Sequence, residues 1–286
     1  MKRLLTAVVA LMLFCSLAQA DALPLDGPAP YPPVASAFGA DGMSYDDGTI
    51  SITIEKDVVG VTNVYFAYVK LTDVSQLRTA LAAPYPSKTT RPVNVMAAEQ
   101  QAVLAINGDF FSYHNKGVVV RSGQILRQQP ESTRDTLIID DSGDFVILTK
   151  NTVAEWKDYL ENGTGCREAF CFGPALIIDG EVQTFKPGDK VSCGAPTPAQ
   201  RMVFCQMDTL SYMIFVCEGP EQDKKAGLTM NEVVEQLVAR GVKHAYNLDG
   251  GNSATLMLGD QRINAPEHKF RQVGDMIYFA TLVSGE

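Results

Sequence analysis

The sequence predicts a single α+β domain, with a mixed, hairpin-rich β-sheet core and a few packed helices. Three observations support this class. Short segments rich in β-forming residues outnumber helical patterns, turns containing Gly or Asn join many of these segments, and no linker-like stretch interrupts residues 49–286. Hydrophobic residues make up 46% of the 286-residue chain, which is enough for one large core.

Residues 1–20 are typical of a secretory signal peptide. Lys2 and Arg3 precede the apolar segment Leu4–Leu17, and a small-residue cleavage motif ends at Ala20. The apolar segment is too short to span a membrane. We therefore expect a soluble mature protein that is secreted or extracytoplasmic.

Residues 21–48 form a Pro/Ala/Gly-rich leader, expected to be poorly ordered or draped over the surface, so the folded domain should begin near Thr49. Removal of the signal peptide changes the formal net charge from −9 to −11. Such an acidic chain repels nucleic acid and anionic lipid, and no nucleic-acid partner is expected. No later segment is long and apolar enough to be an integral membrane span, and the sequence gives no indication of oligomeric state.

Five cysteines remain after Cys15 is removed with the signal peptide: Cys166, Cys171, Cys193, Cys205 and Cys217. In an exported protein this number suggests one or two disulfides and a leftover thiol. Cys166 and Cys171 lie in a Gly-containing loop and are the most plausible pair. The cysteines form no CxxC pair and the three histidines are scattered, which argues against a zinc site.

Alternating or β-branched segments predict most of the strands. They cover residues 50–54, 64–69, 102–106, 117–121, 124–126, 137–139, 145–148, 175–178, 202–205, 212–217, 242–248 and 276–282. A polar loop is expected at residues 186–190.

Four helices are predicted. Asp73 can cap a short helix that carries Leu77, Ala80 and Leu81, and Asn94 can cap a second that reaches Gln101. A third surrounds Trp156. The clearest begins at the capping box of Thr229 and Glu232, and Gly241 stops it. Its apolar stripe is expected to be Val233, Val234, Leu237 and Val238.

The stretch Tyr246–Thr255 puts a carboxylate, two amides, two hydroxyls and two adjacent glycines between apolar runs. Its Asp-Gly-Gly-Asn core is a strong hairpin signal. The same residues suit a ligand site, because glycines allow close approach to the backbone and successive N–H groups can bind an anion. Asn107 and Asp109, just after a buried strand, are open to the same two interpretations: a plain turn or a site at a strand end.

Five separated motifs occur in one order. They are Ala105–Phe111, Gly117–Gly123, Phe172–Leu176, Pro198–Arg201 and Asn247–Ser253. This series resembles the phosphodiester glycosidase family, and the likeness runs from about Ile50 to Val283.

The resemblance implies a hydrolase that cleaves a sugar-1-phosphodiester. The family's best-known member removes N-acetylglucosamine from its phosphodiester on mannose 6-phosphate, and many exported bacterial members are associated with exopolysaccharide. The chain departs from the family pattern at three places. Asp109 stands where many members have glycine, Asn252 replaces a third glycine, and Arg201 is followed by Met202–Cys205 rather than by small residues.

The chemistry of this reaction suggests a role for each residue type. Because phosphate is a good leaving group, the site mainly needs a carboxylate and a cradle for the phosphate. Asp249 is the expected carboxylate, Asp109 a second carboxylate or sugar ligand, and Arg201 a planar donor for phosphate oxygens. The predicted substrate-binding residues are Asn107, Gly108, Arg121, Asn247, Gly250, Gly251 and Ser253. The substrate is expected to be a glycan or sugar phosphate, with no cofactor.

Two other functions remain open. Asp109, Asp249 and neighbouring asparagines would also suit a Ca²⁺- or Mg²⁺-dependent phosphodiesterase, in which oxygen ligands hold the cation. Alternatively, the chain is a non-catalytic exported protein that binds or assembles polysaccharide. Chelator sensitivity separates the first from a metal-free mechanism, and glycan binding without product release indicates the second.

Overall fold

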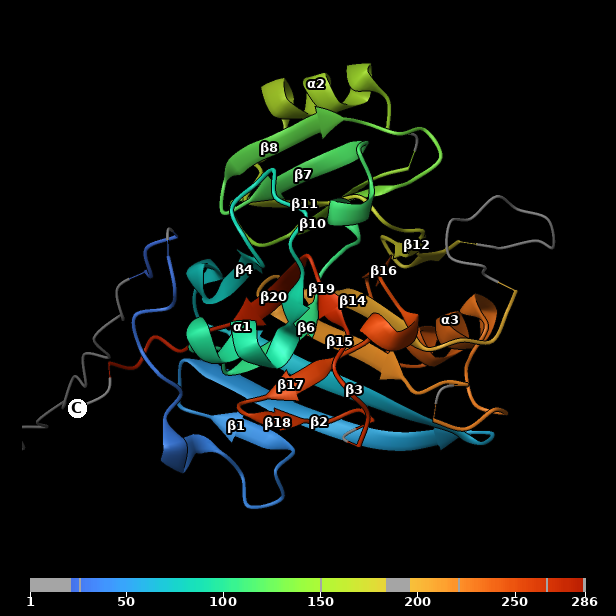
Figure 1. Ribbon diagram of the computed structural model, residues 1–286. Coiled ribbons are helices and arrows are strands. Elements are labelled where there is room, and N and C mark those ends of the chain that lie inside the picture. The colour runs from blue at the N-terminus through green and yellow to red at the C-terminus, as the bar shows by residue number, and fades with distance from the viewer. Residues whose placement is uncertain are drawn as a thin grey trace, which may run out of the picture.

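The computed structural model describes residues 22–25, 27–149, 151–183, 196–220, 222–265 and 267–284. The expected signal peptide, the polar loop at residues 186–190 and Cys193 lie outside these ranges. Two sheets face each other and a third stands over one end of the pair (Figure 1). All strand pairings among the described residues are antiparallel, and with the three α-helices below they confirm the predicted α+β class.

The large sheet has eight strands. In spatial order they are β1 (Ser44–Asp46), β2 (Ile50–Val59), β3 (Thr62–Leu71), β15 (Ser211–Cys217), β14 (Arg201–Asp208), β16 (His244–Leu248), β12 (Ala175–Ile178) and β13 (Glu181–Val182).

The facing sheet has five strands. They are β18 (Gln261–Arg262), β17 (Leu256–Leu258), β6 (Leu104–Asn107), β20 (Asp275–Phe279) and β4 (Leu77–Leu81).

The upper sheet also has five strands. They are β10 (Phe145–Leu148), β9 (Thr136–Ile139), β11 (Glu168–Phe170), β7 (Gly117–Arg121) and β8 (Gln124–Gln129), and a separate short pair joins β19 (Gln272–Val273) to β5 (Arg91–Pro92). The helices are α1 (Val93–Glu99), α2 (Val153–Asn162) and α3 (Met230–Val238), with 3₁₀ turns η1 (Ala35–Ala37), η2 (Val74–Gln76), η3 (Phe111–Tyr113) and η4 (Gly251–Ser253). No helix in the described part of the chain combines the length and apolarity that crossing a membrane requires.

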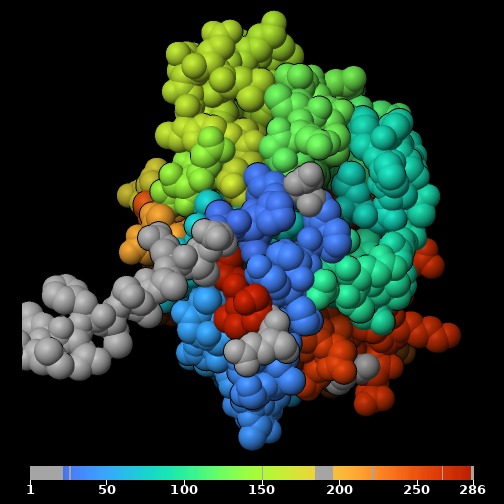
Figure 2. Space-filling model, turned by 90° about the vertical axis from the view of Figure 1, so that its left-hand side faces the viewer, coloured from blue at the N-terminus to red at the C-terminus, as the bar shows by residue number. Residues whose placement is uncertain are grey.

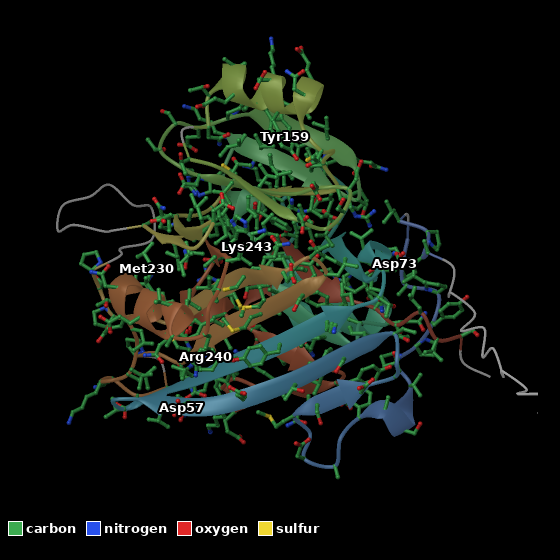
Figure 3. All side chains as sticks on the ribbon, turned by 180° about the vertical axis from the view of Figure 1, so that it is seen from behind. Asp57, Asp73, Tyr159, Met230, Arg240 and Lys243 are labelled. Carbon is green, nitrogen blue, oxygen red and sulfur yellow. The ribbon has the colours of Figure 1, made fainter. Side chains whose placement is uncertain are left out.

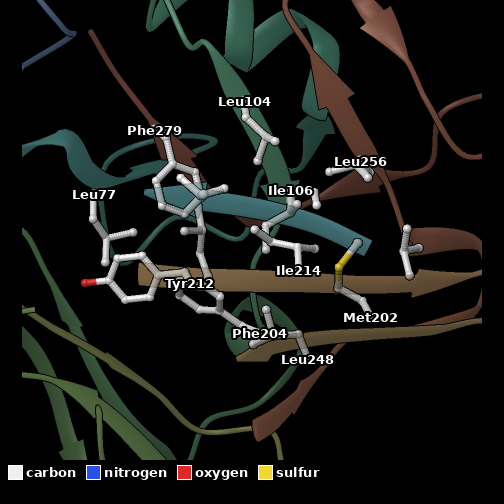
Figure 4. Packing of buried hydrophobic residues seen from close by; sticks show 14 of the residues in the cluster. Leu77, Leu104, Ile106, Met202, Phe204, Tyr212, Ile214, Leu248, Leu256 and Phe279 are labelled. Carbon is white, nitrogen blue, oxygen red and sulfur yellow. The ribbon is translucent and has the colours of Figure 1, made fainter. Parts of the chain in front are cut away.

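The main core fills the space between the large and facing sheets. Phe204 and Ile214 project from the large sheet toward Ile106 and Phe279 of the facing sheet (Figure 4). Because side chains alternate along a strand, the intervening residues of β14, such as Val203, pack on the opposite face against α3. This two-sided burial explains why β14 reads as a continuous apolar run.

One helix covers each outer face. Helix α1 packs on the facing sheet, α3 packs on the large sheet, and Trp156 of α2 is buried against the upper sheet. Tyr159 marks α2 at the top of the molecule in Figure 3, and Arg240, just after α3, lies beside the large sheet. The Arg240 guanidinium stands 3.3 Å from the centre of the Phe66 ring, so the end of α3 is held to β3 by a cation–π contact.

Three details of the predicted helices are wrong. Asp73 does form a capping box, but only over the turn η2, and Leu77–Leu81 is strand β4 because it pairs with β20. Helix α1 begins after Pro92 and ends at Glu99, so Asn94 lies inside it. Val238 is 51% exposed and lies outside the buried stripe of α3.

The leader residues belong to the folded domain more closely than predicted. Strand β1 pairs with β2, and Tyr45 is buried in the main core. Leu23 and Ala29 are buried with α1 and the outer face of the facing sheet. Figure 2 shows this segment, in blue, beside the C-terminal residues, in red. The folded unit therefore starts before Thr49.

The expected disulfide between Cys166 and Cys171 is wrong. The four described cysteines are free thiols. Cys166 and Cys171 flank strand β11, and an extended chain of five residues spans about 16 Å, far beyond the reach of a disulfide. Cys166 packs beneath α2, whereas the Cys171 thiol lies 3.7 Å from Asn151 Nδ2.

Candidate functional site

The Asp249–Thr255 loop is not a hairpin turn. Strand β16 before it belongs to the large sheet and pairs with β14 and β12, whereas strand β17 after it belongs to the facing sheet and pairs with β6 and β18. The chain therefore crosses from one sheet to the other between these strands. We call this segment the crossover loop.

Asn107 holds both ends of the crossover loop. Its Nδ2 donates to the Asp249 carbonyl at 2.8 Å, and its Oδ1 accepts from the Thr255 N–H at 3.1 Å. Asn107 is fully buried at the end of β6, so both hydrogen bonds are shielded from water. This geometry makes Asn107 a residue that positions Asp249, because its amide atoms are hydrogen-bonded within the protein.

The two glycines of the crossover loop serve its close packing. A Cβ on Gly250 would lie 2.5 Å from the Gln200 carbonyl oxygen, and Gly251 has φ of +57°. The Gly251 N–H donates to that same carbonyl, the Ser253 N–H donates to the Gly250 carbonyl, and the Gly250 N–H hydrogen-bonds the Asp249 carboxylate. The predicted N–H cradle for phosphate is therefore already occupied by the protein.

Asp249 is the carboxylate at the centre of the site. Burial raises its pKa above the ordinary range, and the charge of Asp109 acts in the same direction. The Ser253 hydroxyl, by hydrogen bonding, and Arg271, by its charge, oppose that shift. A carboxylate in this environment is suited to proton transfer or to attack on an electron-deficient carbon.

Asp109 is buried and held by three groups. Its Oδ1 accepts from the Phe111 N–H at 2.9 Å, its Oδ2 accepts from the Cys171 N–H at 3.0 Å, and Arg121 Nη2 lies 3.3 Å from Oδ1. These contacts tie the Asn107–Phe111 segment to the upper sheet. The oxygens of Asp109 are therefore used in contacts within the protein, and Asp109 affects Asp249 only through its charge, which raises the pKa of Asp249.

Arg121 lies at the centre of a buried charge cluster. Its guanidinium contacts Asp275 Oδ2 at 2.5 Å and stacks over the Phe170 ring, with 4.2 Å to the ring centre. Gly108 is needed here because any Cβ would collide with the Asp275 carboxylate. The predicted substrate-binding residues Arg121 and Gly108 are therefore packed below the site.

Glu168 adds a third carboxylate to this cluster. Its oxygens accept from the Thr79 hydroxyl at 2.8 Å and from the Ser122 N–H at 3.1 Å. Burial raises the pKa of Glu168 to about 7 and that of Asp275 to about 7, although the charge of Arg121 opposes both shifts. Three carboxylates around one arginine leave an excess of buried negative charge, which favours bound protons near neutral pH.

The crossover loop forms one wall of a cavity of about 440 Å³, at the junction of the sheet pair and the upper sheet. The cavity brings together five of the predicted residues: Arg201, Asn247, Asp249, Gly250 and Gly251. The other five predicted residues, Asn107, Gly108, Asp109, Arg121 and Ser253, are not among those that line it.

Arg201 stands at the start of β14 with its guanidinium anchored to backbone carbonyls. Nε donates to the Leu228 carbonyl at 3.1 Å and Nη2 donates to the Thr197 carbonyl at 2.5 Å. Asn247 donates from Nδ2 to the Gly173 carbonyl, whereas its Oδ1 has no hydrogen-bond partner among the described residues. Asn247 lines the cavity, so this acceptor lies close to the space where a sugar hydroxyl would bind.

Sequence reasoning missed Arg134 and His114, which line the same cavity. Arg134 Nε lies 3.4 Å from Glu131 Oε2 and Nη2 lies 3.1 Å from His114 Nε2, while Nη1 has no partner in the described part of the chain. Burial, followed by the charge of Arg134, lowers the pKa of His114. No motif marks Arg134, since it lies in a loop that meets the cavity only after folding.

Aromatic rings also line the cavity. Phe110 stacks on Tyr113 at 4.5 Å between ring centres and meets Phe172 edge-on at 6.3 Å. Phe110 and Phe172 both line the cavity. No group of three or more His, Cys, Asp or Glu side chains within the described ranges is arranged to hold a metal ion.

The buried cluster predicts a pH-dependent stability. Between pH 4 and pH 7 the folded chain keeps a proton on Glu168 that the unfolded chain releases, so stability falls as pH rises, by at most about 1.4 kcal/mol per pH unit for one group. Glu168→Gln can still accept from the Ser122 N–H and can donate to the Thr79 hydroxyl oxygen, so it should flatten this slope without losing either contact. Urea unfolding at pH 4.5 and 7.5 measures it, with Glu161→Gln on α2 as the exposed control. Equal slopes in all three proteins would contradict the prediction.

Comparison with known proteins gives one family and several solved structures. A search of the curated proteins found no match. The fold is similar to the catalytic domain of zebrafish N-acetylglucosamine-1-phosphodiester alpha-N-acetylglucosaminidase, auto-inhibited by its pro-peptide, with a TM-score of 0.67 and 16% identity over 82% of this chain and 85% of that one. It is also similar to a hypothetical protein from Synechocystis, with a TM-score of 0.53 and 14% identity over 80% and 62% of the two chains.

At these identities the solved structures establish the fold alone. The family follows from the sequence itself, because the phosphodiester glycosidase model matches residues 100–280, more than half of the chain. That range contains the crossover loop, Asn107, Arg134 and Arg201. The protein belongs to the phosphodiester glycosidase family.

Proposed function

We propose that the protein hydrolyses the bond between an anomeric carbon and a phosphate oxygen in a glycan. One observation carries the proposal. Asp249, a carboxylate whose pKa is raised by burial, and Arg134, whose Nη1 has no acceptor among the described residues, line the same cavity. The family and the name of the zebrafish relative support a sugar-1-phosphodiester as the substrate.

In this proposal the phosphate of the substrate binds beside Arg134 and Arg201. A guanidinium offers donors in a plane that matches phosphate oxygens, and one such donor of Arg134 has no acceptor within the described ranges. Arg201 contributes positive charge from the adjoining wall. The sugar then lies toward Asn247 Oδ1 and the Phe110 ring, which supply a hydrogen-bond acceptor and an apolar surface.

Ionised Asp249 acts at the anomeric carbon, either directly or by taking a proton from water. The bond from that carbon to the phosphate oxygen breaks, and its electron pair leaves with the phosphate. Oxygen from water ends on the sugar. The arginines stabilise the charge that grows on the leaving phosphate, which is where a preorganised cation lowers the barrier. The expected signal peptide would place this activity outside the cytoplasm.

The first test is an assay of synthetic sugar-1-phosphodiesters for released sugar. Asp249→Asn should reduce kcat by at least about a hundredfold, because it removes the negative charge but retains the shape. Each protein is assayed with and without chelator. Full activity in Asp249→Asn would overturn the assignment, and loss of activity with chelator would favour the metal-dependent phosphodiesterase. Tight glycan binding with no released sugar would favour the non-catalytic binding protein.

Arg134 is tested separately from Asp249. Arg134→Gln should lower kcat/KM by about 10²–10³, because a donor to the leaving phosphate is lost. Arg91→Gln, which removes an exposed arginine paired with Glu99, is the matched control and should stay within about twofold of the wild type. Equal activity in the two variants would show that Arg134 does not contact the phosphate.

The pH profile tests the state of Asp249. If the ionised form acts, kcat/KM falls as pH falls through the raised pKa of Asp249. Ser253→Ala removes the hydroxyl whose hydrogen bond lowers that pKa, so the acidic limb should move to higher pH while activity on the plateau changes less. An unchanged or downward-shifted acidic limb in Ser253→Ala would contradict this role.

A further inference from the structure

A second cavity adjoins the first and is lined by positive charge. Its volume is also about 440 Å³, and Gln200 lines both cavities. Asn252 of the crossover loop lines the second cavity, next in sequence to Gly251 in the first. Arg262, Lys269 and Arg271 supply three cations, and none of the lining residues that the structure describes is acidic. We call this the basic cavity.

Arg262 gives the basic cavity a rigid and buried cation. Its side chain is 7% exposed, Nη1 donates to the His268 carbonyl at 2.8 Å, and the guanidinium stacks on Phe270 with 4.8 Å to the ring centre. Nε has no hydrogen-bond partner among the described residues. A buried arginine held in place but not ion-paired is costly unless an anion completes it.

The nearest carboxylate does not complete Arg262. The charge of Glu218 is felt at Arg262, yet the Glu218 oxygens accept from Asn63, from the Tyr65 hydroxyl and from the Ala265 N–H. No ion pair between Arg262 and Glu218 is formed. Gln200, which lines both cavities, also has a buried Oε1 with no hydrogen-bond partner in the described part of the chain.

Positive charge in the basic cavity acts on the carboxylate in the first cavity. Arg271 lines the basic cavity, and its charge lowers the pKa of Asp249 in the first. A ligand that occupied both cavities would therefore run past Gln200 and the crossover loop. The charge of the basic cavity requires that ligand to be anionic on this side.

We propose that the basic cavity binds a second phosphate of the same glycan, one unit away from the bond that is cut. This rests on the proposed function and narrows it, because the preferred substrate becomes a glycan with successive sugar–phosphate units rather than a single sugar-1-phosphodiester. Arg262 and Arg271 provide guanidinium donors for that phosphate, and Lys269 provides a flexible ammonium at the rim.

Binding of two synthetic glycans tests the proposal without requiring turnover. One carries a single sugar-1-phosphodiester and the other carries two in succession, and calorimetry on full-length Asp249→Asn protein measures the Kd of each. The second should bind at least about tenfold more tightly, since charge-assisted hydrogen bonds to another phosphate are gained. Adding Lys269→Glu should reduce this ratio severalfold, whereas the exposed control Lys157→Glu should leave it unchanged. Arg262→Gln should also reduce the affinity ratio, in a variant whose melting temperature matches that of the parent protein.

The outcomes separate the two proposals. Equal affinity for the two glycans, or an equal ratio in the Lys269→Glu and Lys157→Glu proteins, would overturn the role of the basic cavity. Cleavage of either glycan by the wild-type protein is measured independently and decides the proposed function. Tighter binding of the second glycan with no cleavage of either would retain the basic cavity and reject the hydrolase.

Discussion

The site depends on a pair of buried hydrogen bonds from one amide. Asn107 ends a strand of the facing sheet, and it binds both the first and the last residue of the loop that arrives from the large sheet. Hydrogen bonds of this kind contribute only about 0.5–1.5 kcal/mol each, but an unpaired buried amide would cost more than the bonds contribute. Asn107 therefore fixes where the two sheets meet and where Asp249 stands.

A buried charge cluster beside Asn107 imposes a second constraint on the site. Asp109 and Arg121 join the segment after β6 to the upper sheet, and Gly108 allows Asp275 to approach. The charged groups pair with one another, in a cluster that contains more acidic than basic side chains. Their contribution to function is to hold the walls of the cavity together. Buried groups without a partner among the described residues remain at Arg134 and Asn247, and both residues line the cavity.

The two cavities lie on either side of the crossover loop. Gly251 lines one and Asn252 lines the other, so the loop that carries Asp249 also separates two regions that attract anions. The acidic net charge of the whole chain is compatible with such local basic regions, because short-range charges dominate inside a cavity where salt screens little. A glycan rich in phosphate would therefore be attracted to the two cavities and not to the rest of the acidic chain.

Local sequence patterns determined much of the fold: the alternation of apolar residues on β2 and the capping box at Thr229 both appear where predicted. The ordered motifs also indicated the family and placed Asp249, Arg201 and Asn247 in one site. Only the tertiary structure decided which strands pair across the Asp249–Thr255 loop, because turn chemistry is the same for a hairpin and for a crossover between sheets. It likewise decided which polar groups satisfy one another, as at Asp109 and Arg121, and which have no partner among the described residues, as at Arg134 Nη1. Those outcomes depend on neighbours that are distant in sequence.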